Sequence, residues 1–154
     1  MYTEQDFQDI SAQLKKRIIT FSIPAIMMLA LVIIFFILRN QALTTIASLL
    51  LGAYGIFAFG MFIHPVFAYR RHLHYVLHGR VRKLTGAFKE MDETIALRDG
   101  VRYYAMLINV GKMENPEDDR LFYYDANLPR PDWQVGDMIT ITSHDKNVGA
   151  WEKA

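Results

Sequence analysis

The chain has 154 residues, and its 17 Lys and Arg residues nearly balance its 16 Asp and Glu residues, for a net charge of +1. This even balance provides no overall field that would attract nucleic acid or an acidic substrate. The absence of cysteine excludes disulfides, thiolate zinc sites, iron–sulfur clusters and a cysteine nucleophile. The charges are distributed unevenly, because Arg39 is the only charged residue of these four types between Ile18 and Ala68.

The first part of the chain contains two apolar runs. Residues 18–38 form a stretch of 21 residues without a charge, enough for a helix to cross the roughly 30 Å hydrocarbon core of a bilayer. A second run extends from Leu43 to Ala68 and is long enough to cross with tilt. The first run is too long for a signal peptide, and acidic residues precede its basic flank. We therefore predict a transmembrane hairpin over residues 18–69.

Basic residues flank the two runs on one side only. Eight of them lie beside the outer ends of the runs, whereas the connecting turn carries only Arg39. The positive-inside rule then predicts that residues 1–17 and 79–154 are cytoplasmic, with the hairpin in a plasma membrane of the bacterial type. Six of the basic residues are predicted to lie at the membrane surface, where they would meet anionic headgroups: Lys15, Lys16, Arg17, Arg70, Arg71 and Arg80.

A short helix is predicted on each cytoplasmic side of the hairpin. Residues 1–17 contain an amphipathic pattern that begins after Thr3, and they form either a surface helix or an extension of the first span. Residues 70–79 continue the second span as a basic juxtamembrane helix that ends at Gly79. His74 and His78 are four residues apart and share a face of this helix, which makes them weak candidates for a metal pair. No third ligand is close in sequence, so we predict neither a metal nor another cofactor.

Small residues recur along the second apolar run. Ser48, Gly52 and Gly55 follow each other at intervals of four and three residues, and Gly60 comes further on. Such a stripe allows another helix to approach closely. The second helix of the hairpin therefore has a predicted packing surface, either for the first helix of the same chain or for another subunit.

The segment 80–154 has the pattern of a small β-domain. Alternating apolar and polar residues predict five strands, separated by turn-rich pieces, over 81–90, 101–110, 120–125, 138–143 and 148–152. Five short strands predict an all-β barrel of the OB-like or SH3-like kind. The alternative is an α+β domain in which Phe88–Leu97 forms a helix. The paired tyrosines Tyr103-Tyr104 and Tyr123-Tyr124 would each send one ring inward and one outward.

The layout of a membrane hairpin followed by a small barrel resembles that of the short NfeD-type proteins. The resemblance concerns architecture only. It therefore implies no activity and assigns no site residue.

No arrangement of residues in this segment indicates an enzyme. The acidic stretch Glu114–Asp119 lacks the spacing of a calcium loop, and the neighbours Ser143, His144 and Asp145 point apart in a strand or turn. The 11 Lys and Arg residues of 80–154 face 13 Asp and Glu residues, which argues against binding a phosphate backbone. We expect a non-catalytic membrane adaptor or accessory subunit whose partners are the lipid bilayer and either other membrane subunits or a second copy. The alternative is a ligand- or metal-responsive membrane protein that uses His74 and His78.

Overall fold

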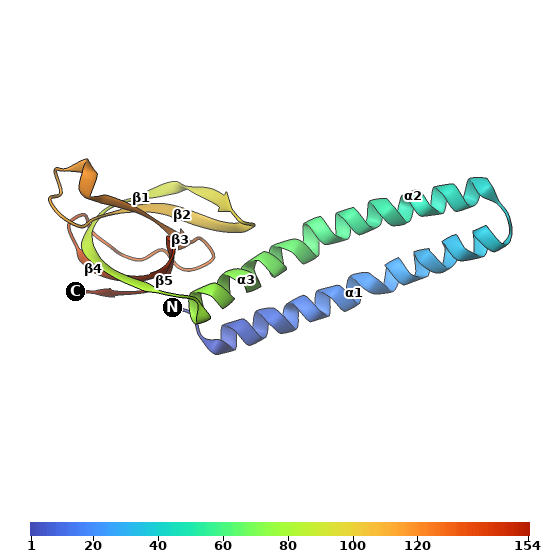
Figure 1. The fold of residues 1–154 in the computed structure, drawn as a ribbon, viewed down its shortest axis with the longest axis horizontal. Helices are drawn as coiled ribbons and strands as arrows, with labels where there is room; N and C mark the ends of the chain where they lie inside the picture. Colours follow the sequence, from blue (N-terminus) through green and yellow to red (C-terminus); the bar gives the residue numbers. More distant parts are fainter. The chain divides into compact units, whose positions relative to one another are not determined.

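The structure is a computed structural model that describes all 154 residues. Its chain forms two compact units, one comprising Gln8–Phe67 and the other Met1–Phe7 together with Ala68–Ala154. The helices and strands, labelled in Figure 1, are α1 (Glu4–Ile37), α2 (Gln41–Ala58), the π-helical segment η1 (Phe59–Ile63), α3 (His64–His78), β1 (Arg82–Arg98), β2 (Val101–Asn109), the 3-10 segment η2 (Pro116–Asp118), β3 (Asp119–Asp125), β4 (Met138–His144) and β5 (Asn147–Lys153).

The first unit is a helical hairpin. Helix α1 runs without a break from Glu4, so residues 4–17 extend the first apolar run, which is one of the two predicted alternatives. Its N-terminus carries a reciprocal cap, in which the backbone N–H of Asp6 donates to the Thr3 hydroxyl and the backbone N–H of Thr3 donates to the Asp6 carboxylate. Asn40 caps α2 by accepting from the backbone N–H of Leu43 at 3.1 Å.

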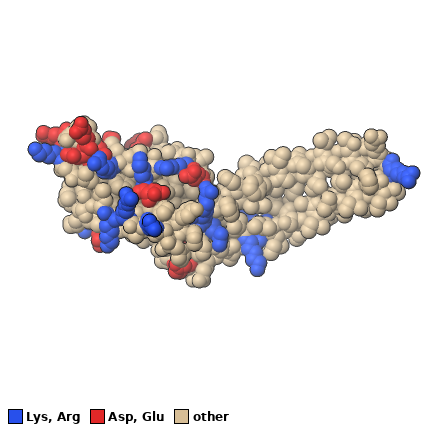
Figure 2. Space-filling model, viewed as in Figure 1, with Lys and Arg blue, Asp and Glu red and all other residues tan.

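The two helices meet along one face of α2. Ala47, Leu51 and Tyr54 are partly buried there, Ala58 is buried, and the Tyr54 hydroxyl donates to the Phe21 carbonyl at 3.0 Å. Most large apolar side chains of the hairpin remain exposed within the chain, and its surface carries almost no charge (Figure 2). Two helices of this chain are long and apolar enough to cross a membrane, one spanning Glu4–Ile37 and the other Gln41–His78.

Pro65 explains the π-helical turn between α2 and α3. Proline has no backbone N–H, so the Met61 carbonyl loses its usual donor four residues later. The chain widens into the five-residue π-helix Phe59–Ile63 just before this position. The Arg17 guanidinium donates to the Phe62 carbonyl at 2.8 Å, within the same irregular stretch. This hydrogen bond satisfies a backbone group at a point where the helical ladder is interrupted.

The β-domain is a strongly curled sheet of mixed pairing. Its hydrogen-bonded order runs β1-β2-β3-β5-β4, and β4 pairs again with β1. All pairs are antiparallel except β3–β5, which is parallel and registered at one position only, Tyr123 with Asn147. The five predicted strands are thus present, and they form one five-stranded mixed sheet in which β3 and β5 are joined by a single residue pair. The chain as a whole, two long helices followed by a mixed sheet, is consistent with the α+β class.

Strand β1 is longer than its sequence pattern predicted. It extends to Arg98, so the alternative of a helix over Phe88–Leu97 is wrong. The first half of β1 pairs with β4 and the second half with β2, and the register shifts after Phe88 and after Met91. Such irregularities bend a strand and raise its twist, which lets one strand serve both sides of a curled sheet.

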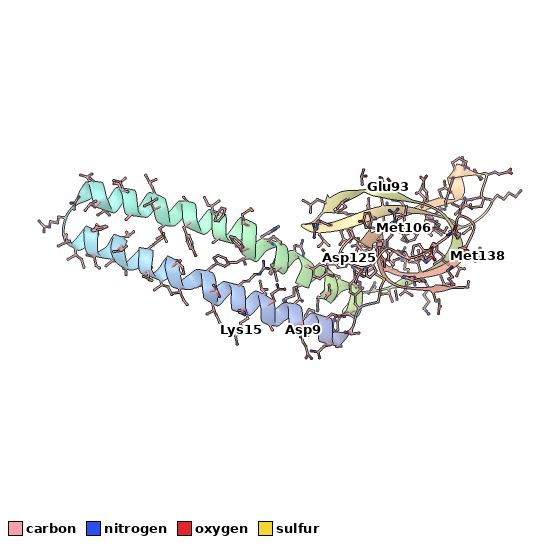
Figure 3. All side chains as sticks on the ribbon, turned by 180° about the vertical axis from the view of Figure 1, so that it is seen from behind. Asp9, Lys15, Glu93, Met106, Asp125 and Met138 are labelled. Atoms are coloured by element: carbon pink, nitrogen blue, oxygen red, sulfur yellow. The ribbon has the colours of Figure 1, made fainter.

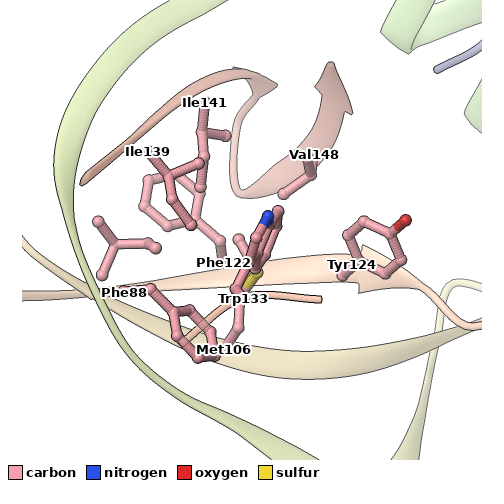
Figure 4. Close-up of a cluster of buried hydrophobic side chains, with 9 residues drawn as sticks. Phe88, Met106, Phe122, Tyr124, Trp133, Ile139, Ile141 and Val148 are labelled. Carbon is pink, nitrogen blue, oxygen red and sulfur yellow. The ribbon is translucent and has the colours of Figure 1, made fainter. Parts of the chain in front are cut away.

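The main core lies inside the curl of the strands. Side chains from all five strands and the loop before β4 gather there, as Figure 4 shows, and the buried members are Phe88, Met106, Ile108, Phe122, Tyr124, Trp133, Ile139, Ile141 and Val148. The Trp133 ring meets those of Phe88, Tyr124 and Trp151 with centroid distances of 5.0–5.9 Å. Alternation along the strands fills this core and leaves the other face of the sheet for a second, smaller cluster.

Candidate functional site

The second face of the sheet is covered by the part of α3 that belongs to the domain. Ala68 packs with Val101 and Tyr103 of β2 in a small buried cluster, and Leu73 and Val76 are buried further along the helix. Gly149 of β5 permits this close approach, because a Cβ atom there would lie 2.5 Å from Cγ1 of Val76. The helix thereby fixes the polar side chains of its buried face against β2 and β3.

A buried aspartate at the end of β3 organises the polar part of this layer (Figure 3). Asp125 is fully buried, and its Oδ2 accepts hydrogen bonds from the hydroxyls of Tyr2 and Tyr69, each at 2.8 Å. Its Oδ1 accepts from the backbone N–H and the side-chain amide of Asn127, also at 2.8 Å. A carboxylate removed from water is costly unless such donors replace its hydration. These four hydrogen bonds therefore tie the N-terminus and α3 to β3.

His72 extends the network, and the chemistry of its neighbours fixes its tautomer. The Tyr2 hydroxyl donates its hydrogen to Asp125, so in its contact with His72 at 3.2 Å it must accept from Nε2–H. Nδ1 is then the unprotonated nitrogen and accepts from the Tyr103 hydroxyl at 3.0 Å. A directed chain of hydrogen bonds results, from Tyr103 through His72 and Tyr2 to Asp125. We call the five side chains of Tyr2, Tyr69, His72, Tyr103 and Asp125 the tyrosine latch.

Burial favours the neutral forms of the histidine and the tyrosines of the latch. It lowers the pKa of His72 below the ordinary value, an effect that the charge of Asp125 partly opposes. Burial also raises the pKa of the Tyr2 and Tyr103 hydroxyls, and the negative charge of Asp125 raises it further. A neutral imidazole and protonated phenols are the forms that the hydrogen-bond directions require.

A polar cavity of about 370 Å³ opens beside the latch. His72 and Tyr103 line it, so the latch forms part of its wall. Charged and amide side chains from α3, the β1–β2 turn and the β4–β5 turn complete the lining: Arg71, Arg98, Asp99, His144, Asp145 and Asn147. The cavity therefore presents both cationic and anionic groups, together with hydrogen-bond donors and acceptors.

His144 is held in one orientation at this cavity. Its Nδ1 lies 2.9 Å from the Arg80 carbonyl, which can only accept, so Nδ1 carries the proton. The ring stacks on Tyr75 with a centroid distance of 5.4 Å and an interplanar angle of 4°. In the neutral imidazole, Nε2 is left as an acceptor, 3.8 Å from the Asp145 carboxylate.

The predicted metal pair lies outside the latch. The rings of His74 and His78 stack with centroids 5.1 Å apart, and Nε2 of His78 lies 3.1 Å from the Glu4 carboxylate. No group of three or more His, Cys, Asp or Glu side chains is placed to hold a metal ion. A metal site at His74 and His78 therefore stays a hypothesis from sequence spacing.

The small-residue stripe does not face the first helix of the hairpin. A Cβ atom added at Gly52, Gly55 or Gly60 would meet no other atom within 4 Å, and Ser48 is exposed, with its hydroxyl bonded to the Thr44 carbonyl. The face that packs against α1 instead contains Ala47, Leu51, Tyr54 and Ala58, as described above. Within this chain the stripe has no partner.

The predicted membrane-surface residues have different environments. Arg17 is bonded to the Phe62 carbonyl, the Arg70 guanidinium lies 5.0 Å from the ring centroid of Phe7, and Arg71 lines the cavity. Lys15, Lys16 and Arg80 are exposed. Their position at a membrane surface remains a prediction.

Sequence reasoning identified the tyrosine pairs but missed the latch. Tyr104 and Tyr124 belong to the interior of the sheet, whereas Tyr103 and Tyr123 lie on the face covered by α3. The ring of Tyr103 is buried on this covered face. The signal that was missed is Asp125, which stands at the end of a predicted strand two residues before Asn127. An aspartate in such a turn can accept hydrogen bonds from the backbone two residues on. Nothing near Asp125 in the sequence points to Tyr2.

Comparison with known proteins finds no match among family models, curated proteins or solved structures.

Proposed function

We propose that this protein is a non-catalytic adaptor or accessory subunit that the hairpin anchors in the plasma membrane. Both termini and the β-domain lie in the cytoplasm, where the domain docks to a partner complex. The exposed apolar side chains of the hairpin support the anchoring role, because a surface of this extent is unfavourable in water and favourable in lipid. The basic residues beside the outer ends of the hairpin support the cytoplasmic orientation.

The observation that carries the adaptor role is the open small-residue stripe of α2. In lipid, helices associate through close packing rather than through a water-driven force, and small residues are the usual contact surface. Gly52 and Gly55 leave such a surface unoccupied by any other part of the chain. A helix of another subunit, or the same stripe of a second copy, would complete it.

The β-domain supports docking to protein rather than to nucleic acid. We interpret it as a small barrel of the OB-like or SH3-like kind; the OB-like type is a partly open five-stranded arrangement that commonly carries a binding surface. Residues 80–154 contain more acidic than basic residues, so the domain lacks the positive charge of a protein that binds a phosphate backbone. The latch ties the part of α3 that belongs to the domain to β2 and β3.

The stripe is tested by comparing Gly52→Ile with Ala53→Ile, an exposed position on another side of α2. Each full-length variant is purified from native membranes in mild detergent, and its assembly is measured by native mass spectrometry. We expect Gly52→Ile to lose the bound subunit or second copy, because the new side chain holds the neighbouring backbone away, and Ala53→Ile to retain it. Equal assembly of the two variants, or a monomeric wild type, contradicts the proposal.

A further inference from the structure

The polar cavity of the domain has an unusual set of unused hydrogen-bonding groups. Arg71 makes no hydrogen bond or ion pair, and Arg98 makes no hydrogen bond, lying 3.7 Å from the Asp99 carboxylate and 4.8 Å from the ring centroid of Tyr123. On the turn between β4 and β5, Oδ1 of Asn147 is buried without a hydrogen-bond partner. Protein atoms therefore leave two guanidinium groups and one buried acceptor unsatisfied at the same cavity.

The acceptors gather on the β4–β5 turn. Nε2 of His144 is unprotonated in the tautomer fixed by the Arg80 carbonyl, and the Asp145 carboxylate is 83% exposed, with His144 as its one contact. Together with Oδ1 of Asn147 they offer three acceptor groups, one of them charged. A primary ammonium group has three N–H donors and one positive charge, which matches this set.

The guanidinium groups favour an anion with several oxygens. Arginine presents a planar fork of donors that suits phosphate and carboxylate. The two arginines Arg71 and Arg98 are balanced in formal charge by the aspartates Asp99 and Asp145 of the same cavity. A simple anion or a simple cation would therefore leave charges of the opposite kind unpaired, whereas a zwitterion complements both sides.

We propose that this cavity binds a zwitterionic headgroup of the phosphoethanolamine type. Arg71 and Arg98 hold the phosphate, and the turn at His144, Asp145 and Asn147 holds the primary ammonium. The cavity volume of about 370 Å³ falls within the range of small-molecule sites. Arg71 comes three residues after Ala68, where the second apolar run ends, so a spanning hairpin would bring it to the headgroup layer. The inference that the headgroup belongs to a membrane lipid rests on the proposed membrane anchoring, whereas the match between the cavity and a zwitterion does not.

The test uses the full-length protein, stripped of lipid in a maltoside detergent. Soluble glycerophosphoethanolamine and glycerophosphocholine are titrated separately by calorimetry. We expect the ethanolamine compound to bind and the choline compound to bind at least about tenfold more weakly, because its quaternary ammonium has no N–H to donate. Equal binding of the two compounds, or no binding of either, overturns the proposal.

Two variants locate the site. Arg71→Gln and Asp145→Asn should each weaken binding of glycerophosphoethanolamine about tenfold or more. Neither group makes a buried contact whose loss would unfold the domain, and Asn tolerates the positive φ of 54° at position 145. Arg82→Gln, at an exposed arginine outside the cavity, removes the same charge as Arg71→Gln and should bind as the wild type does. Unchanged affinity in both cavity variants overturns the assignment.

The source of the headgroup is tested with whole phospholipid. Phosphatidylethanolamine or phosphatidylcholine is added to the detergent-solubilised protein, and lipid retention is measured by native mass spectrometry. Retention of phosphatidylethanolamine that Arg71→Gln abolishes supports a lipid ligand. Binding of the soluble compound without retention of the lipid supports the same site with a free zwitterion as its ligand. Because this binding is measured in detergent, it can succeed even where the membrane topology proves wrong.

Discussion

The hydroxyl group of Tyr2 should be far more important for stability than its place at the start of the chain suggests. Tyr2→Phe removes one oxygen atom that donates to Asp125 at 2.8 Å and accepts from His72 at 3.2 Å. The buried carboxylate then loses one of its four hydrogen bonds, and the imidazole N–H is left unpaired. A hydrogen bond to a charged group contributes about 1.5–3 kcal/mol, and an unsatisfied buried donor costs about 1–3 kcal/mol. Since the two effects overlap at one atom, we expect the free energy of unfolding to fall by about 2–4 kcal/mol.

Tyr104→Phe provides a matched control. It makes the same chemical change in the same domain, but the Tyr104 hydroxyl makes no hydrogen bond, and the contact of Arg130 with the ring is available to phenylalanine. Unfolding of the full-length protein in detergent micelles is followed by tryptophan fluorescence. Both tryptophans, Trp133 and Trp151, belong to the β-domain, so the signal reports that domain alone. A loss for Tyr2→Phe no larger than that for Tyr104→Phe would refute the latch.

Three further predictions follow from the same structure. The pKa of His72 is lower in the folded state, so the unfolded state binds the extra proton first. The domain should therefore have its full stability above about pH 6.5 and lose stability as the pH falls below that value. Denaturation at a series of pH values should show a smaller loss for His72→Asn than for the wild type. A fragment starting at Gly79 lacks α3 and with it Tyr69 and His72, whereas a fragment starting at Ala68 keeps both; circular dichroism should therefore show a lower melting temperature for the shorter fragment. An impermeant maleimide applied to intact cells should label Gln41→Cys but not Glu114→Cys, and the reverse pattern would contradict the cytoplasmic position of the domain.

The strands were predictable because local turn chemistry marks their ends. Four of the five observed strands lie within one residue of their predicted limits, as for Met138–His144 after the turn at Gly136. The prediction ended β1 too early, because residues 92–98 are exposed on both faces and lack the alternation that marks a half-buried strand. The single-pair junction of β3 and β5 depends on how far the whole sheet curls, which no local pattern records.

The candidate site was less accessible to sequence reasoning because its contacts are long-range. Tyr2 and Asp125 are separated by 123 positions in the sequence. Each can stabilise the fold through this hydrogen bond only because the other lies beside it. The orientation of the stripe illustrates a second limit. Gly52 and Leu51 are neighbours on α2, and either could have faced α1, because the sequence does not define the rotation of one helix against another. The spacing marks a stripe of small residues, but only the packed hairpin distinguishes the face of α2 that contacts α1 from the open one.

Cysteine cross-linking across the stripe tests the adaptor proposal most directly. The chain has no cysteine, so Gly52→Cys and Ala53→Cys each introduce one reactive thiol at exposed positions of the same helix. In native membranes treated with an oxidant or a short bifunctional maleimide, we predict a discrete cross-linked product of defined mass for Gly52→Cys and none for Ala53→Cys. A product of twice the mass of the chain identifies a second copy, and any other mass identifies a partner subunit. Equal cross-linking at both positions, or none at Gly52→Cys, would contradict the proposal that this face of the hairpin assembles with another helix.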